Sequence, residues 1–346
     1  MRIGIAFDLV PIVASTDGPD DRYEEFDKPQ TIEALADVLR GEGHNVILLG
    51  DGREFLQRVL DDPPDFVWNL AEGEGGGRNR EARVPAALEM LGIPYSGSDP
   101  LTLAAALDKG VAKRLVESAV AVPQGFTFPS GLSSSEVTSL IHTARLRERS
   151  NQWIVKPSFE GSSKGIRSRC IADTDHDVIE LYQSLSRDYG QPILIEEFIA
   201  GDEVTVGIVG NGDQAEVIGA MKIRPKTPDD RFVYSIEVKR DWDERVDYET
   251  PARLASDTMT RLIRSALGAY EALGCRDLAR IDFRIRAGVP YFIEANPLPG
   301  LAPDWSDLII LARGMGIGYP ELIRKVLRVA LTRVGLEPSS RSRVGS

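Results

Sequence analysis

The chain has 346 residues, which is long enough for two or three domains with substantial cores. Its 42% hydrophobic and 27% charged residues are ordinary for a globular protein, and its formal net charge of −12 argues against nucleic acid or an anionic membrane as a partner held by bulk electrostatics. No run approaches the ~20 apolar residues of a membrane span, and residues 1–5 begin as a strand rather than as a secretory signal. Because Cys170 and Cys275 are far apart and form no CxxC pair, we expect reduced thiols in a cytoplasmic protein.

The first hundred residues alternate predicted strands and helices, which is typical of a small parallel α/β domain. The predicted elements are strands at 2–7, 45–50 and 65–70 and helices at 31–40 and 80–91. In such domains the loops that follow the strands bind ligands. The glycine-rich run 71–78 follows the third strand, but its spacing does not fit G-x-G-x-x-G, so it does not indicate a dinucleotide site.

Two elements of the central part suggest phosphate binding. A helix predicted over 102–118 carries Lys109 and Lys113 four residues apart, a spacing that is usually a solvated face. A strand that ends at Lys156 runs into the small-residue loop 158–165. Backbone N–H groups of such a loop can face phosphate oxygens while the lysine adds a point charge; the alternative is an ordinary surface hairpin.

The next strand suits an adenine ring. It is apolar over 192–195 and ends in Glu196 and Glu197, so it offers an apolar bed, backbone groups and an acid for ribose hydroxyls. The stretch 221–251 is rich in charge and poor in pattern, and we expect it to be a lid over the site. A core helix around 259–270 and a final amphipathic helix at 320–331 complete the predicted elements.

A hairpin over 280–296 is the best candidate for a metal site. Its two alternating runs flank residues 287–290, and a hairpin symmetric about Gly288 places Asp282 opposite Glu294 and Arg280 opposite Asn296. Facing carboxylates repel one another unless a cation lies between them, and oxygen ligands of this kind suit Mg²⁺. A solvated hairpin is the alternative, but the prolines and glycine that follow Asn296 favour a fixed loop against a site.

Several motifs in the same order resemble the D-alanine–D-alanine ligase family of ATP-grasp enzymes, from the first strand to about residue 330. They are I-P-Y-S-G-S, L-D-K-x-x-x-K, V-K-P-S-x-E-G-S-S-x-G, E-E-F-I-x-G-x-E-x-T-V, R-x-D-F and E-A-N-P-x-P-G. The resemblance implies an N-terminal α/β domain at 1–100, a central ATP-grasp subdomain at 101–191, a C-terminal subdomain with the metal site and lid at 192–335, and a frayed tail at 336–346. ATP would lie between two antiparallel sheets.

The resemblance also implies residue roles at the nucleotide. The phosphate-contacting lysines would be Lys109 and Lys156, the loop over the phosphates Glu160, Gly161, Ser162 and Ser163, the adenine-edge and ribose acids Glu196 and Glu203, and the adenine hinge Glu197, Phe198 and Ile199. The ligands of two Mg²⁺ ions, which Mn²⁺ can replace, would be Asp282, Glu294 and Asn296.

At the reacting centre, the family pattern implies that Arg280 and the backbone N–H of Gly300 stabilise the tetrahedral intermediate. Lys239 would be the phosphate-binding lysine of the lid, and Ser162 would lie where the family's lid tyrosine makes contact. Ser306, one residue out of register, would hold the carboxylate of the second substrate, and Glu25 or Glu24 the ammonium group of the first.

Departures from the family pattern concern the substrates. Residues 69–72 replace the usual His-Gly start of the first-domain loop, Pro297-Leu298 replaces Thr-Ser, and Arg240 stands where an aromatic residue is expected, so we expect Arg240 to bear on substrate choice. The expected function is an ATP-dependent ligase that joins two amino acids through an acylphosphate, in a cytoplasmic homodimer serving peptidoglycan and cell-wall synthesis. The alternatives are the same chemistry on other amino acids or a peptide, and, less favoured, a nucleotide-binding regulator.

Overall fold

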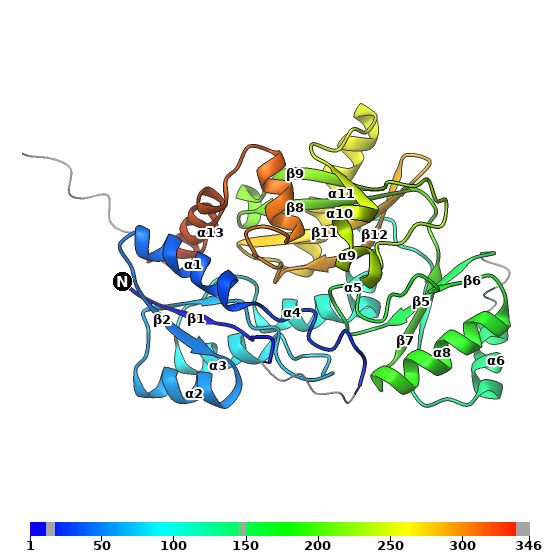
Figure 1. The fold of residues 1–346 in the computed structure, drawn as a ribbon, viewed down its shortest axis with the longest axis horizontal. Helices are drawn as coiled ribbons and strands as arrows, with labels where there is room; N and C mark the ends of the chain where they lie inside the picture. The colour runs from blue at the N-terminus through cyan, green and yellow to red at the C-terminus, as the bar shows by residue number, and fades with distance from the viewer. Residues whose placement is uncertain (12–17, 145, 147–149, 337–346) are drawn as a thin grey trace, which may run out of the picture.

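The computed structural model describes residues 1–11, 18–144, 146 and 150–336. Its strands are β1 (Arg2–Ala6), β2 (Asn45–Gly50), β3 (Phe66–Asn69), β4 (Gly125–Phe128), β5 (Trp153–Pro157), β6 (Ile171–Ala172), β7 (Ile193–Glu197), β8 (Asp202–Val209), β9 (Glu216–Pro225), β10 (Val246–Glu249), β11 (Leu278–Arg286) and β12 (Val289–Asn296). They form a parallel sheet in the order β2-β1-β3 and two antiparallel sheets in the orders β4-β7-β5-β6 and β10-β9-β8-β11-β12. This confirms the predicted α/β class. Figure 1 shows the parallel sheet at the left, the four-stranded sheet at the right and the five-stranded sheet above them.

The parallel sheet lies in the part of the chain before residue 100, residues 1–11 and 18–99, which we call the first segment. Its neighbouring helices are α1 (Pro29–Gly41), α2 (Gly52–Asp61) and α3 (Arg83–Leu91). α1 starts at a proline, which suits the first helical turn, and buries Ile32, Leu35 and Leu39 on one stripe. α2 was not predicted, because its buried stripe consists of only Phe55 and Val59.

The four-stranded sheet is covered by α6 (Ser134–Thr143) and α8 (Asp175–Tyr189). A capping box starts each helix, Ser133 with Glu136 and Thr174 with Asp177, so both starts are fixed locally. β7 pairs with β4 and β5. The predicted boundary between residues 191 and 192 therefore separates β7 from its own sheet, and the division is better placed after Glu197.

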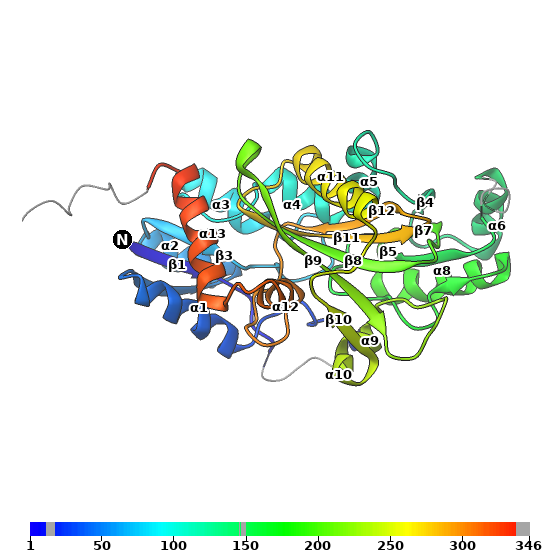
Figure 2. The same ribbon diagram turned by 90° about the horizontal axis from the view of Figure 1, so that it is seen from above.

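The five-stranded sheet has two chemically different faces. Ile281, Phe283 and Ile285 of β11 pack in a core with α11 (Ser256–Leu273), while the alternate residues Arg280 and Asp282 point to the other face. Figure 2 shows α11 and α5 (Lys109–Val116) together along one side of this sheet. The apolar side chains of β11 thus hold the sheet against α11, and its polar side chains are available for a binding site on the other face.

Two predicted stretches differ in the structure. The helix predicted over 102–118 is two helices, α4 (Pro100–Leu107) and α5, because the side chain of Asp108 accepts from the Val111 N–H and starts a new helix. The predicted lid is not structureless: it contains α9 (Ile236–Arg240), α10 (Trp242–Arg245) and β10, which pairs with β9. We call residues 226–245 the lid.

The end of the described chain returns to the first segment. α12 (Asp307–Gly314) follows the loop after β12, and the 3₁₀ turn Gly212–Gln214 joins β8 to β9. α13 (Tyr319–Arg333) shares one apolar core with β1 and α1, and Figure 2 shows it crossing beside them. The predicted frayed tail lies outside the described residues from 337 onward. None of the described helices combines the length and apolarity needed to cross a membrane.

Candidate active site

Two adjoining cavities contain the predicted site. The sheet cavity is lined by residues of β5, β7, β8 and β11, and the N-terminal cavity by residues of the first segment, the loop 158–165 and the loop 297–300. Lys239, Arg280 and Glu294 line both cavities and so mark their junction. The predicted residues in the lining are Glu25, Lys109, Lys156, Glu160, Gly161, Ser162, Ser163, Glu196, Glu197, Phe198, Ile199, Glu203, Lys239, Arg280, Asp282, Glu294, Asn296, Gly300 and Ser306. Arg240 is the one predicted site residue that lines neither.

Asp282 lies opposite Glu294 and Arg280 opposite Asn296, as predicted, but a register shift between Asp282 and Phe283 sets Phe283 opposite Phe292 rather than Ile293. Asp282 accepts from the Asn296 amide at 3.0 Å and from the Thr205 hydroxyl at 2.6 Å. Burial raises the pKa of Asp282, and the neighbouring carboxylate of Glu294 adds to that rise. No three His, Cys, Asp or Glu side chains form a metal-ligand group in the described chain, but two repelling carboxylates and an amide fit a hard cation such as Mg²⁺.

Arg280 is held between two acids at the junction. Its guanidinium donates to Asp282 at 3.0 Å and to Asp307 at the start of α12. The Tyr234 hydroxyl of the lid donates to the same Asp307 at 3.2 Å. A buried guanidinium fixed on two carboxylates is pre-oriented, so it can oppose negative charge that develops in the adjoining cavities.

Three buried lysines contact Glu196 and Glu294, two acids that line the sheet cavity. Lys156 and Lys113 contact the two oxygens of Glu196 at 2.7 and 3.1 Å, and Lys109 contacts Glu294 at 3.2 Å. Burial would raise the pKa of Glu196, but the two lysines hold it below its ordinary value. The solvated face considered for Lys109 and Lys113 is wrong, because the break after α4 turns both side chains inward.

The loop 158–165 has an unusual backbone conformation. Ser162 and Ser163 have φ of 47° and 60°, in the left-handed region that non-glycine residues seldom adopt. The Ser163 hydroxyl donates to the Tyr234 carbonyl at 2.8 Å, which joins the loop to the lid. Lys239 of the lid lies over the Tyr234 ring, with its ammonium 5.2 Å from the ring centre. The lid therefore covers this loop.

Two acids predicted to lie at the nucleotide, the ribose acid Glu203 and Glu197 of the adenine hinge, are paired with arginines of β11. Arg284 donates to Glu203 at 2.9 Å and stacks over Phe198 at 4.8 Å, and Arg286 donates to Glu197 at 2.6 Å. Burial raises the pKa of Glu203 despite the arginine beside it. These pairs connect the hinge after β7 to the sheet that carries the metal candidates.

Glu25 is fully engaged by groups of the protein. Its carboxylate accepts from Arg80 at 2.9 and 3.0 Å, from Lys164 at 2.6 Å and from the Gly161 N–H at 2.7 Å. Glu160 also contacts Arg80 and Lys164. Two acids and two cations thus form a neutral group of four, which we call the Glu25 quartet.

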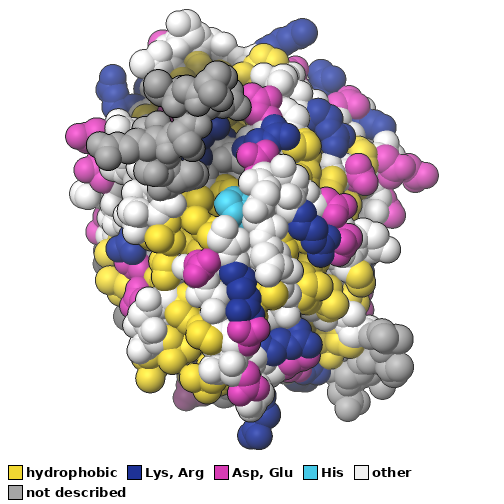
Figure 3. Space-filling view, turned by 90° about the vertical axis from the view of Figure 1, so that its left-hand side faces the viewer, with side chains coloured by type: hydrophobic (Ala, Val, Ile, Leu, Met, Phe, Trp, Pro, Cys, Tyr) yellow, Lys and Arg dark blue, Asp and Glu magenta, His cyan; other side chains and the backbone are white. Residues whose placement is uncertain are grey.

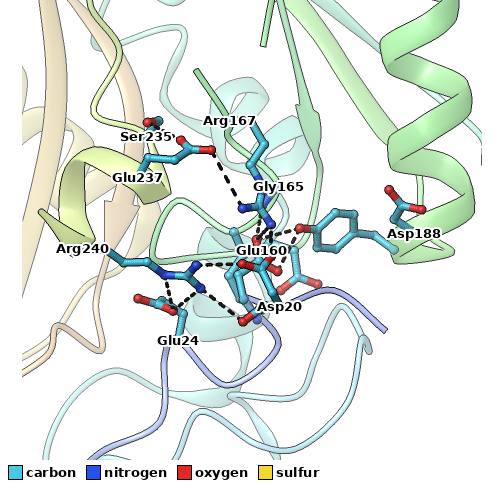
Figure 4. A network of polar contacts seen from close by, with 12 residues as sticks. Asp20, Glu24, Glu160, Gly165, Arg167, Asp188, Ser235, Glu237 and Arg240 are labelled. Carbon is cyan, nitrogen blue, oxygen red and sulfur yellow. Dashed lines mark hydrogen bonds and ion pairs between the residues drawn. The ribbon is translucent and has the colours of Figure 1, made fainter. Parts of the chain in front are cut away.

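Arg240 lies in a second ionic cluster that joins three distant segments (Figure 4). It donates to Asp20 at 2.7 Å and to Glu24 at 2.9 Å, so it ties α9 of the lid to the first segment. Arg167, which follows the loop 158–165, also pairs with Asp20 and lies 3.9 Å from Glu237 of α9. We call this cluster the latch.

Burial in the first segment predicts an unusual dependence of stability on pH. It raises the pKa of Asp8, Asp27 and Glu81 to about 7, so between ~pH 4 and 7 the folded state binds more protons than the unfolded state and stability falls as pH rises. Glu25 and Glu294, whose pKa is lowered to about 2, oppose this only below ~pH 4.5. The Tm of the unliganded protein is expected to be about 5 °C higher near pH 5.5 than near pH 8.

Differential scanning fluorimetry across this range measures that difference. The Glu81→Gln variant has no titratable carboxyl at this position, so its Tm should differ less between the two pH values than that of the wild type. A Tm that is flat or rises from ~pH 5.5 to 8 would contradict the assignment of these buried acids.

Several charged residues of the site were not predicted. The run R-N-R-E after the glycine-rich loop, beyond the end of β3, was a usable signal, because ligand contacts gather at such strand ends. No local signal marked Lys164, which occupies a variable position in its motif. The unpredicted residues are Glu72, Arg80, Glu81, Lys113, Lys164, Arg284 and Asp307.

Comparisons with known proteins agree with this geometry. A family model described as "D-ala D-ala ligase C-terminus" matches residues 139–328. The D-alanine–D-alanine ligases of Geotalea uraniireducens and a Synechococcus species are each 30% identical, over 305 residues (87% of this chain, 90% of the relative) and 319 residues (90% and 91%).

Solved structures show the same fold. The D-alanine–D-alanine ligase of Bacillus anthracis complexed with ATP aligns with a TM-score of 0.71 at 22% identity, over 96% of this chain and 98% of that one. The VanG D-Ala:D-Ser ligase of Enterococcus faecalis aligns with a TM-score of 0.70 at 20% identity, over 95% and 99%. Because the family model matches more than half of the sequence and the relatives match most of it, the chain belongs to the D-alanine–D-alanine ligase family of ATP-grasp enzymes.

Proposed function

We propose that the protein is a ligase that uses Mg·ATP to join two amino acids through an acylphosphate, with D-alanine as the first substrate to test. The observation that carries this proposal is the junction of the two cavities at Lys239, Arg280 and Glu294. A nucleotide in the sheet cavity would place its phosphates at this junction, next to a carboxylate in the N-terminal cavity. This is the arrangement that phosphoryl transfer to a carboxylate requires.

The residues around the junction can bind and neutralise phosphates. Lys156 is buried in the lining of the sheet cavity and Lys109 in that of the N-terminal cavity, and Lys239 of the lid lines both. Asp282, Glu294 and Asn296 would hold Mg²⁺, which when bound neutralises phosphate oxygens and favours the departure of ADP. We propose two such ions on this set, because the family pattern implies them.

The chemistry then needs no nucleophile from the protein. An oxygen of the substrate carboxylate attacks the γ-phosphorus, ADP leaves, and an acylphosphate forms. The amine of the second amino acid attacks the carbonyl carbon, the amine loses a proton, and phosphate leaves. Arg280 and the Gly300 N–H oppose the negative charge on the carbonyl oxygen, and Ser306, whose hydroxyl lies beside Gly300, would bind the second carboxylate.

Closure of the lid would protect the acylphosphate from water, and the latch supports closure. Replacing Arg240 by alanine removes both of its ion pairs with the first segment. Because each pair is partly exposed and worth up to about 1 kcal/mol, we expect KM for ATP and amino acid to rise by about fivefold with little change in Tm. The difference in KM between the variant and the wild type should be smaller at high salt, because salt screens these ion pairs in the wild type.

Steady-state kinetics at low and high salt test this expectation. Arg245→Ala is the matched control, because Arg245 is a lid arginine that pairs within the lid, with Asp241. Equal effects of the two substitutions, or none for Arg240→Ala, would show that the latch does not hold the lid.

The remaining expectations follow from family membership. We propose a cytoplasmic homodimer that serves peptidoglycan synthesis, without nucleic acid or membrane as a partner. Exposed apolar side chains in the first segment support association, because Leu60 and Met90 are 63% and 89% exposed. Figure 3 shows hydrophobic side chains gathered between charged ones on this end of the molecule.

The first experiment is phosphate release from Mg·ATP with D- and L-amino acids, singly and in pairs, with products identified by mass. D-alanyl-D-alanine from D-alanine alone would establish the proposed function. Release with another pair but not with D-alanine would select the alternative of a redirected ligase, which the engaged state of Glu25 favours. ATP hydrolysis that ignores every amino acid would refute both.

A further inference from the structure

The Glu25 quartet leaves the expected ammonium site without free charge. In the quartet, two carboxylates face two cations, and the Glu25 side chain is only 4% exposed. Burial alone would raise the pKa of Glu25, yet Lys164 and Arg80 lower it to about 2. A substrate ammonium would have to displace one of these cations from a buried, charge-assisted contact.

Other acids of the same cavity have no partner. Glu72 follows β3, Glu81 precedes α3, and both line the N-terminal cavity. The structure gives neither side chain a hydrogen bond or an ion pair with any described residue. Glu81 is nevertheless buried, with only 7% of the residue exposed. Burial raises the pKa of both carboxyls, and the carboxylates of Glu81 and Glu25 add to the rise in Glu72. The charge of Arg80 opposes the rise in both, but its guanidinium is paired with Glu25. A buried carboxylate without a partner is costly, and a ligand cation would remove that cost.

The lining of the N-terminal cavity carries charges of both signs. It includes Arg280 of β11 and Lys239 of the lid, which suit a carboxylate, and Glu72 and Glu81 of the first segment, which suit an ammonium group. Apolar residues, among them Leu107 and Leu298, also line it. This distribution is complementary to a zwitterionic amino acid or to a peptide with a free amine.

We propose that Glu72 and Glu81 bind the ammonium group of the substrate whose carboxylate is activated, and that Glu25 is a positioning residue that fixes the loop 158–165 through Arg80, Lys164 and the Gly161 N–H. This assignment rests on the proposed ligase function. It predicts that the substrate must carry a cation, so a 2-hydroxy acid is refused even when it has the same shape as the amino acid.

The test compares alanine with lactate of the same configuration as the activated acid, with hydroxylamine as the common amine that attacks the acylphosphate, in wild type, Glu72→Gln, Glu81→Gln and the double variant. Phosphate release should favour alanine by about 100-fold or more in the wild type and by less than about tenfold in the double variant, while KM for ATP changes little. Glu117→Gln is the control, because Glu117 is exposed at the end of α5. The double variant should also have a higher Tm than the wild type near pH 8, because it lacks one buried and one partly buried acid that have no partner.

Glu25→Gln separates the two roles. It should lower Tm and kcat without changing the ratio of alanine to lactate. If the preference for alanine over lactate is lost in Glu25→Gln but kept in the double variant, the proposal is overturned and Glu25 binds the ammonium group.

If the wild type releases no phosphate with any amino acid, the proposed function fails, and binding decides the inference separately. Calorimetry with D-alanine, L-alanine and the two lactates, in the presence of Mg²⁺ and a non-hydrolysable ATP analogue, measures it. Alanine binding that the double variant loses would uphold the ammonium site. Equal binding by both proteins, or no binding of alanine by the wild type, would overturn it.

Discussion

Replacing Glu294 by glutamine is expected to lower amino-acid-dependent phosphate release by on the order of 10³-fold while the protein stays folded. Glutamine keeps the shape of the side chain but removes one of the two carboxylates that face each other across the hairpin. It also weakens the contact that holds Lys109 at 3.2 Å. A divalent cation that depends on Asp282 and Glu294 together would bind far more weakly.

The measurement is phosphate release over a range of Mg²⁺ concentrations, with circular dichroism and Tm as checks of folding. Higher Mg²⁺ should restore part of the activity, because the defect is in ion binding. Glu271→Gln, an exposed change on α11, serves as the control. Activity near that of the wild type at low Mg²⁺ would refute the metal assignment.

Replacing Arg280 by lysine is expected to lower kcat by roughly 10²-fold with little change in KM for ATP. Lysine keeps the charge, but it lacks the fork that reaches Asp282 and Asp307 together. The charge is then no longer fixed where the tetrahedral intermediate forms. Alanine would be a poor probe at this position, because it would leave two buried carboxylates uncompensated and unfold the site.

Single-turnover and steady-state rates separate the two possible defects of this variant. A kcat effect with unchanged KM means that Arg280 acts in the transition state. A rise in KM for the amino acid at constant kcat would instead make Arg280 a ground-state contact and contradict its assigned role. Arg264→Lys, an exposed change on α11, is the control.

The hairpin could be predicted from sequence because its information is local. Side chains two apart share a face, and symmetry about Gly288 predicts that Asp282 lies opposite Glu294, as found. The observed turn at Ala287-Gly288 alone would set Asp282 opposite Ile293, and a register shift between Asp282 and Phe283 brings it opposite Glu294. The left-handed conformation of both turn residues matches such a turn. The two-helix break at Asp108 was also encoded locally, as a second N-cap, but the continuous apolar stripe around it concealed the signal.

The environment of Glu25 could not be predicted, because its partners are distant in the chain. Arg80 comes from the first segment and Lys164 from the loop 158–165, and only the folded arrangement brings them onto one carboxylate. The burial of Lys113 has the same origin: its ammonium reaches the carbonyls of Phe292 and Ile293, far along the sequence. Motifs identify which residues are present at such a site, whereas the pairing of charges depends on packing.

The shared core of α1 and α13 has a consequence for synthesis of the protein. Leu35 and Leu39 of α1 pack in the same cluster as Leu322 and Val326 of α13, which the ribosome makes long after α1. At ~5–20 residues per second, the apolar stripe of α1 waits for tens of seconds before its partner exists. During that interval the first segment is a natural client for a chaperone, and loss of α13 would leave it aggregation-prone even though every residue of the active site had been made.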